Sequence, residues 1–103
     1  MRIIKKLSEK IAEEIEDAGC YAKMALEYRD QYPELARVVS NIAQQEMDHM
    51  QSLHALVVQI IDQYRRTNGE PPAAMQAVYD YLHAKHIDDA AEVKAKIAMY
   101  KGQ

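Results

Sequence analysis

The chain has 103 residues and a formal net charge of −3, with 49% hydrophobic and 28% charged residues. This length allows one domain with a modest core, and the mixing of acidic and basic residues excludes the basic face of a nucleic-acid-binding protein. No stretch approaches the roughly 20 apolar positions of a membrane-spanning helix, so we expect neither nucleic acid nor membrane as a partner.

The first predicted element is a helix over residues 2–31. Mostly apolar residues recur in it at alternating steps of three and four, which is the spacing of one helix face. The face comprises Ile4, Leu7, Ile11, Glu14, Ala18, Tyr21, Ala25 and Tyr28. Glu14 is unusual there, because an ionised carboxylate taken out of water costs several kcal/mol unless a cation or hydrogen bonds compensate.

The second predicted element is a helix over residues 33–66, which Pro33 opens at its first turn. Asn68-Gly69 and Pro71-Pro72 end it and form a turn. Its face has the same alternating spacing and again includes polar residues among apolar ones. The face comprises Leu35, Val39, Ile42, Glu46, His49, Leu53, Leu56 and Ile60.

Two shorter helices are predicted after this turn, one over residues 72–85 and a last one that begins at Asp88 or Asp89 as its N-cap. The sequence thus predicts an all-α single domain over residues 1–103, with an antiparallel two-helix hairpin over 1–67 and a C-terminal helical extension over 71–103. The two long helices would span roughly 45 and 50 Å at about 1.5 Å per residue. Such a hairpin leaves one side of each face uncovered, so we expect two chains to pair into a four-helix bundle.

Glu46 and His49 lie three residues apart, so both side chains emerge from one side of the helix, one turn apart. Carboxylate and imidazole are ligands that iron and manganese prefer. In di-iron bundles, two helices give one Glu each and two others give Glu-x-x-His. This chain has one of each kind, with Glu14 on the first helix, so a homodimer would supply four Glu and two His. The alternative is a polar notch that fixes the register of a purely structural bundle.

Two sequence runs resemble the encapsulated ferritins. The first is Glu13-Glu14-Ile15-Glu16-Asp17-Ala18-Gly19-Cys20-Tyr21, and the second is Pro33-Glu34-Leu35-Ala36 followed by Glu46-Met47-Asp48-His49. The Glu-x6-Tyr and Glu-x-x-His pattern is similar, more distantly, to rubrerythrins. The resemblance covers residues 11–56 and implies a ferritin-like four-helix bundle formed by a dimer.

The resemblance implies that Glu14, Glu46 and His49 bind the irons of a ferroxidase centre at the dimer interface. Tyr21 would hydrogen-bond to a ligand carboxylate, and Glu13 and Glu16 would form an acidic site that attracts Fe(II) on its way to the centre. The implied activity is oxidation of Fe(II) to Fe(III) by oxygen, which feeds iron storage. Manganese or another divalent metal is an alternative occupant.

The implied partners are a second copy of the chain, a higher ring of such dimers and an encapsulating shell protein. The chain departs from this family at Cys20, where the family often has Trp, and from Glu70 onward, where no counterpart and no apolar targeting peptide is recognisable. The single cysteine excludes an internal disulfide framework and favours a cytoplasmic location, including the interior of a protein nanocompartment.

Two other functions compete with the ferroxidase. One is a peroxide-reducing di-iron protein of the rubrerythrin kind, which would need an external electron donor because one cysteine cannot build a four-cysteine iron module. The other is a non-enzymatic helical assembly protein. Among the remaining histidines, we interpret His54 as a hydrogen-bonded interface residue. His83 and His86, with Asp80 one turn earlier, could bind a metal, although exposed helix histidines are common.

Overall fold

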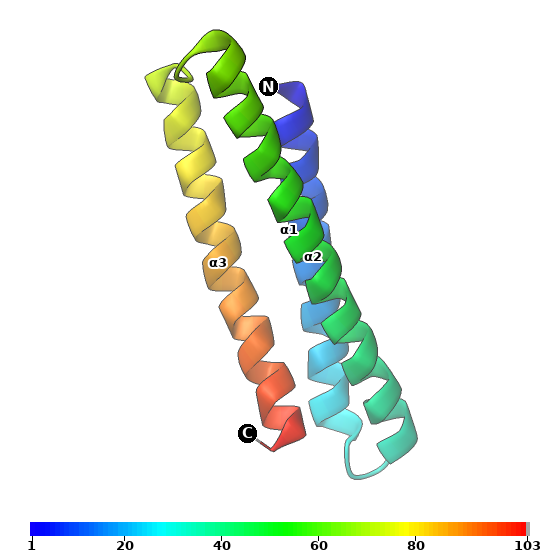
Figure 1. Cartoon of the computed structure of the whole chain (residues 1–103). Helices are drawn as coiled ribbons and strands as arrows, with labels where there is room; N and C mark the ends of the chain where they lie inside the picture. The colour runs from blue at the N-terminus through cyan, green and yellow to red at the C-terminus, as the bar shows by residue number, and fades with distance from the viewer. Residues whose placement is uncertain (103) are drawn as a thin grey trace.

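A computed structural model describes residues 1–102 as three α-helices without strands. Helix α1 spans Arg2–Tyr28, α2 spans Pro33–Asn68 and α3 spans Ala73–Lys101. α1 and α2 form an antiparallel hairpin, and α3 returns along α1 to give an elongated bundle of 55 × 20 × 17 Å (Figure 1). The predicted all-α class is confirmed and is consistent with a ferritin-like helical fold. Gln103, the last residue of the predicted domain, lies outside the described residues.

The turn between α1 and α2 follows from Pro33. The residue before a proline avoids the helical region, and Tyr32 has φ −134° and ψ 72°. The chain therefore leaves the helix before Tyr32, and α1 ends at Tyr28 rather than at the predicted Gln31. Pro33 then occupies the first turn of α2, where a missing N–H costs nothing.

The connection from α2 to α3 is set by Gly69 and two prolines. Gly69 has φ +80°, a conformation that favours glycine, and its N–H donates to the carbonyl of Arg65 at 3.0 Å. α2 extends to Asn68, two residues beyond the predicted end, since nothing before the glycine stops it. No helix in residues 1–102 is long and apolar enough to cross a membrane.

The C-terminal region corrects the sequence prediction. Instead of two short helices, Ala73–Lys101 is one continuous helix that ends at Gly102, with φ +81°. Asp88 and Asp89 are not N-caps, because no glycine or proline between Pro72 and Gly102 interrupts the helix before them. Asp89 instead pairs with Lys85 Nζ one turn earlier at 2.8 Å, a contact that supports a continuous helix.

The main core lies where the three helices meet near the middle and lower half of the bundle in Figure 1. Alanines and Gly19 on α1 let the helices approach closely, and a Cβ at Gly19 would lie 3.6 Å from Val93 Cγ2 of α3. α3 packs mainly against α1 and makes far less contact with α2. The cluster comprises Ile11, Ile15, Ala18, Ala22, Ala43, Met47, Met50, Ala90, Val93 and Ile97.

The predicted face of α1 divides into two rows with different environments. The inner row is fully buried and comprises Ile4, Ile11, Ala18 and Ala25, each at most 1% exposed. The outer row is half-buried to exposed and comprises Leu7, Glu14, Tyr21 and Tyr28. Because α3 covers another side of α1, nothing in residues 1–102 covers the outer row completely.

Candidate metal centre

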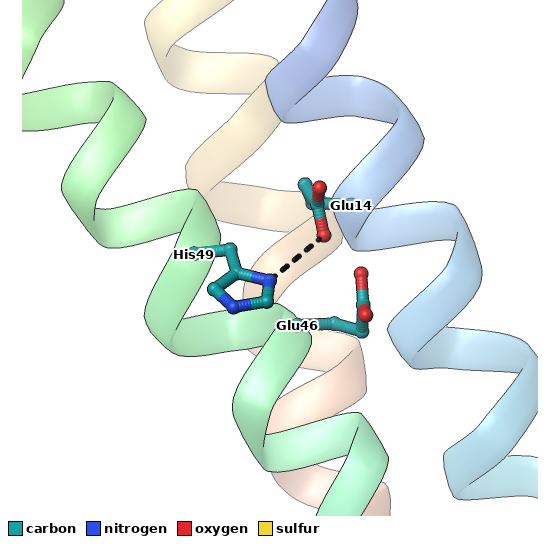
Figure 2. A group of neighbouring side chains, drawn as sticks. All are labelled: Glu14, Glu46 and His49. Carbon is teal, nitrogen blue, oxygen red and sulfur yellow. Dashed lines mark ion pairs between the residues drawn. The ribbon is translucent and has the colours of Figure 1, made fainter.

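Glu14, Glu46 and His49 lie together on the side of the hairpin that α3 leaves open. α1 supplies Glu14, and one turn of α2 supplies Glu46 and His49, whose side chains point toward Glu14 across the helix pair (Figure 2). One ligand atom from each of the three lies within 4.8 Å of the others. Within the described part of the chain, no other group of three His, Cys, Asp or Glu side chains brings its ligand atoms this close together. The predicted convergence of these residues is therefore present in a single chain.

The three side chains differ in their access to solvent. The side chain of Glu14 is 26% exposed, whereas that of His49 is 62% exposed, and Nδ1 of His49 lies 3.6 Å from Oε2 of Glu14. Glu46 is half-buried beside them. The group thus has a protein-facing side at Glu14 and an open side at His49.

The carboxyl group of Glu46 has a raised pKa. The main cause is that protonated Glu46 can hydrogen-bond to Glu14; burial and the negative charge of Glu14 raise the pKa further, and His49 opposes the shift. Two carboxylates held this close repel one another when both are ionised, so a proton or a cation is needed to balance them. A divalent cation would satisfy this need without a proton.

The environment of the Glu14 carboxylate indicates whether a cation would fit at this site. Its Oε2 atom is buried and has no hydrogen-bond partner within residues 1–102. A buried carboxylate oxygen without a partner is costly, and native proteins rarely retain one without a reason. A metal ion held by Glu14, Glu46 and His49 would satisfy this oxygen, so the donor set fits a bound cation.

Tyr21 lies two turns along α1 from Glu14 and packs, partly buried, against the main core cluster. The hydrogen bonds found in residues 1–102 include none from Tyr21 to Glu14, Glu46 or His49. Its packing role is therefore visible, and its role in orienting a ligand stays a prediction.

Glu13 and Glu16, the predicted acidic capture residues, are exposed. Glu13 pairs with Lys10 Nζ at 3.2 Å, and Glu16 lines a groove between α1 and α3. Neither belongs to the Glu14 group within one chain. Their role in attracting Fe(II) stays a prediction that this structure does not test.

The sequence analysis named His54, His83 and His86 separately and did not predict that they would lie together; no hydrogen bond of His54 is found in residues 1–102. His54 of α2 and His83 of α3 stack with ring centroids 4.7 Å apart, and His86 is buried beside them, 9% exposed. The signal was available in the sequence, because His86 shares a helix face with the buried residues Ala90, Val93 and Ile97. It was missed because two separate helices were predicted there.

Comparison with family models matches residues 5–102 to rubrerythrin. The chain belongs to the rubrerythrin family. No curated protein and no solved structure matches it. The match covers nearly the whole of this rubrerythrin-family chain, α3 included, but it does not single out the encapsulated ferritins.

Rubrerythrin-type domains typically bind iron, and the site of this rubrerythrin-family chain has the chemistry for it. Hard carboxylate oxygens and one imidazole nitrogen suit iron and manganese better than soft thiophilic metals. Glu14, Glu46 and His49 would hold the ion.

Proposed function

We propose that the protein binds iron at a di-iron site shared by two copies of the chain and oxidises Fe(II) there. The observation that carries the proposal is that the Glu14 group is an incomplete ligand set on an open face of the hairpin. It combines a buried carboxylate oxygen that lacks a hydrogen-bond partner with an imidazole that is 62% exposed on an uncovered face.

The ligand count supports a partner copy. A di-iron bundle needs two helices that give one Glu each and two that give Glu-x-x-His. α1 and α2 supply one of each, and α3 adds no carboxylate or histidine to the group. A second chain, related by a twofold axis and placed over the open side, would bring the total to four carboxylates and two imidazoles.

The surroundings of the group also fit a dimer. The outer row of α1 continues above and below Glu14 with Leu7, Tyr21 and Tyr28. On α2, Leu35 is 41% exposed and Leu56 is 45% exposed. Burying such side chains contributes roughly 25 cal/mol for each Å² of apolar surface removed from water. A second hairpin on this face would cover these residues and seal the metal group from solvent.

In this function Fe(II) is the substrate and dioxygen is the electron acceptor. Two Fe(II) ions lose one electron each, and dioxygen takes both electrons with two protons and leaves as hydrogen peroxide. Glu14 and Glu46 supply the negative charge that favours Fe(III) over Fe(II). A cation bound between Glu14 and Glu46 would offset the charge repulsion that raises the pKa of Glu46.

Reduction of peroxide is a second candidate, which the rubrerythrin match favours. Hydrogen peroxide would then take two electrons and two protons and leave as two molecules of water. A separate donor would have to return the electrons, since the single cysteine of these 103 residues cannot hold a four-cysteine iron module. The same residues serve both reactions, so the preferred oxidant distinguishes them.

The test is an anaerobic Fe(II) titration followed by exposure to oxygen or to peroxide, read by absorbance. We expect saturable binding near one iron per chain and fast oxidation by oxygen. Glu14→Gln should abolish both. The matched control is Asp48→Asn, because Asp48 lies inside the Glu-x-x-His motif but is exposed and outside the metal group.

Three results would redirect the proposal. Oxidation by peroxide that is much faster than by oxygen favours the rubrerythrin-type reaction. Binding without oxidation leaves a metal-binding assembly protein. Iron binding unchanged by Glu14→Gln rules out this site.

A further inference from the structure

Three of the four histidines of the chain lie where the middle of α2 faces α3, and they are here called the histidine cluster. α2 contributes His54, and α3 contributes His83 and His86, which lie one turn apart on one face. All three line a cavity of about 300 Å³, together with Met50 and Gln51 of α2. The rings of His54 and His83 lie 4.7 Å apart with an angle of 22° between their planes. Two segments far apart in the sequence thus bring three imidazoles to one cavity, in which His86 is buried and His83 is exposed.

Neighbouring charged side chains form no hydrogen bonds with these imidazoles. Asp80, one turn before His83, accepts a hydrogen bond at Oδ1 from Gln76 Nε2 at 2.9 Å. Asp89, one turn after His86, pairs with Lys85. The hydrogen bonds of residues 1–102 include none to or from His54, His83 or His86. Their ring nitrogens are therefore free of protein hydrogen bonds.

The cluster is separate from the Glu14 group. His54 follows His49 by five residues, which turns its direction by about 140° around the helix axis. It therefore faces α3, whereas His49 faces the open side of the hairpin. The two groups share no residue.

We propose that His54, His83 and His86 form a second metal site, which takes a borderline divalent ion such as Zn²⁺ or Co²⁺. Three imidazoles without a carboxylate select such ions over Fe²⁺ and Mn²⁺, and three protein ligands leave one position of a tetrahedral ion open to water. The ion would join α3 to α2, which otherwise touch each other much less than either touches α1.

Binding requires a rearrangement of side chains. In residues 1–102 the only three ligand atoms within 4.8 Å of one another are those of the Glu14 group, so the cluster's nitrogens do not converge on one point here. The stacked rings of His54 and His83 have to rotate about their side-chain torsions to direct nitrogens inward. The cavity beside them gives the space for that rotation.

The test uses the full-length chain with the first site removed by Glu14→Gln, Glu46→Gln and His49→Gln. Co²⁺ is titrated into this variant, and its visible absorbance reports nitrogen ligands and coordination number. We expect one Co²⁺ per chain, displaced by Zn²⁺, and a loss of affinity of roughly tenfold or more on adding His54→Gln or His83→Gln. Gln51→Ala, which alters the same cavity without removing an imidazole, is the control.

A second measurement uses the wild-type chain, in case the triple variant does not fold. Imidazole NMR signals of His54, His83 and His86 should change on addition of Zn²⁺, with the His49 signal identified by its loss in His49→Gln. No Co²⁺ binding by a folded triple variant would overturn the proposal. So would binding that survives both His54→Gln and His83→Gln, or imidazole signals that Zn²⁺ leaves unchanged.

Discussion

Glu46 is the residue at which stability and metal binding have opposite requirements. Its raised pKa means that the folded, metal-free chain resists ionising it beside Glu14. A group with a raised folded pKa contributes stability at low pH that is lost as the pH rises through that pKa. The proposed metal site needs the same carboxylate in its ionised form, so bound metal would offset the repulsion that the empty site carries.

Glu46→Gln should therefore stabilise the metal-free protein while it removes metal binding. We expect the unfolding temperature of the metal-free chain to rise by about 2–4 °C, since one carboxylate of a repelling pair is gone. Added Mn²⁺ or Fe²⁺ should then raise the unfolding temperature of the wild type but not that of the variant. Asp48→Asn serves as the control, and a Glu46→Gln protein less stable than wild type in the absence of metal would contradict this explanation.

The histidine cluster predicts a loss of stability in acid. Burial lowers the pKa of both His54 and His86, and neighbouring histidines lower it further, while Asp89 opposes the shift at His86. The unfolded chain binds these protons near the ordinary pKa of 6.5, whereas the folded chain binds them only at lower pH. The stability that these two neutral histidines contribute is therefore full above pH 6.5, and it is lost as the pH falls through their lowered pKa values.

Urea unfolding on both sides of pH 6.5 measures this effect. The measurement is made in a Glu46→Gln background, because Glu46 contributes stability that increases toward low pH and would mask the effect of the histidines. His86→Gln in this background should lose less stability in acid than its parent. Equal losses in the two proteins would show that burial of His86 is not the cause.

At the scale of the helices, local signals in the sequence predicted most of the fold. Pro33 and the Gly69-Pro71-Pro72 turn fixed the ends of α2 within two residues, because glycine and proline act through the local backbone. The face spacing also predicted that Glu14, Glu46 and His49 would meet. The division of that face into inner and outer rows was not predictable, because it depends on which side of α1 receives α3. The continuity of α3 was missed because Asp88 and Asp89 were interpreted as the start of a new helix. Aspartate is an N-cap only where a helix begins, and elsewhere it can lie within a helix.

The continuity of α3 is tested by Asp89→Pro. Proline is tolerated in the first turn of a helix but costs about 3 kcal/mol in its interior. We expect Asp89→Pro to reduce the free energy of unfolding by about that amount, because residue 89 lies in the middle of α3. Asp89→Ala controls for the lost ion pair with Lys85. A proline variant as stable as the alanine variant would instead support two separate helices.

The contact between α1 and α3 predicts a substitution that increases the free energy of unfolding. Glycine inside a helix is less favourable than alanine by about 0.5–1 kcal/mol, and a Cβ at Gly19 would make an ordinary contact of 3.6 Å with Val93. Gly19→Ala should therefore raise the free energy of unfolding by up to about that amount. Chemical denaturation checks it, with Gly19→Val as an overpacked comparison, and a destabilised alanine variant would mean that the two helices lie closer.

At the scale of the whole molecule, a single chain is a three-helix bundle with one hairpin face left open. That face carries Glu14, Glu46 and His49 at its centre and half-exposed apolar residues on both sides of them. A non-enzymatic assembly protein would use the same face and would show no change in melting temperature on metal addition or chelation. An interfacial metal site should be strongly stabilised by its ion, by about 2.7 kcal/mol at a free metal concentration 100 times the dissociation constant.

The most direct test measures oligomeric state and bound iron on the same samples. Sedimentation equilibrium under anaerobic conditions gives the monomer–dimer distribution over a dilution series, with and without Fe(II), and iron per chain is determined in parallel. We predict that Fe(II) promotes dimers, that bound iron falls in step with the dimer fraction, and that Glu14→Gln removes this linkage. Monomers that bind iron as tightly as dimers would contradict a site shared between two chains.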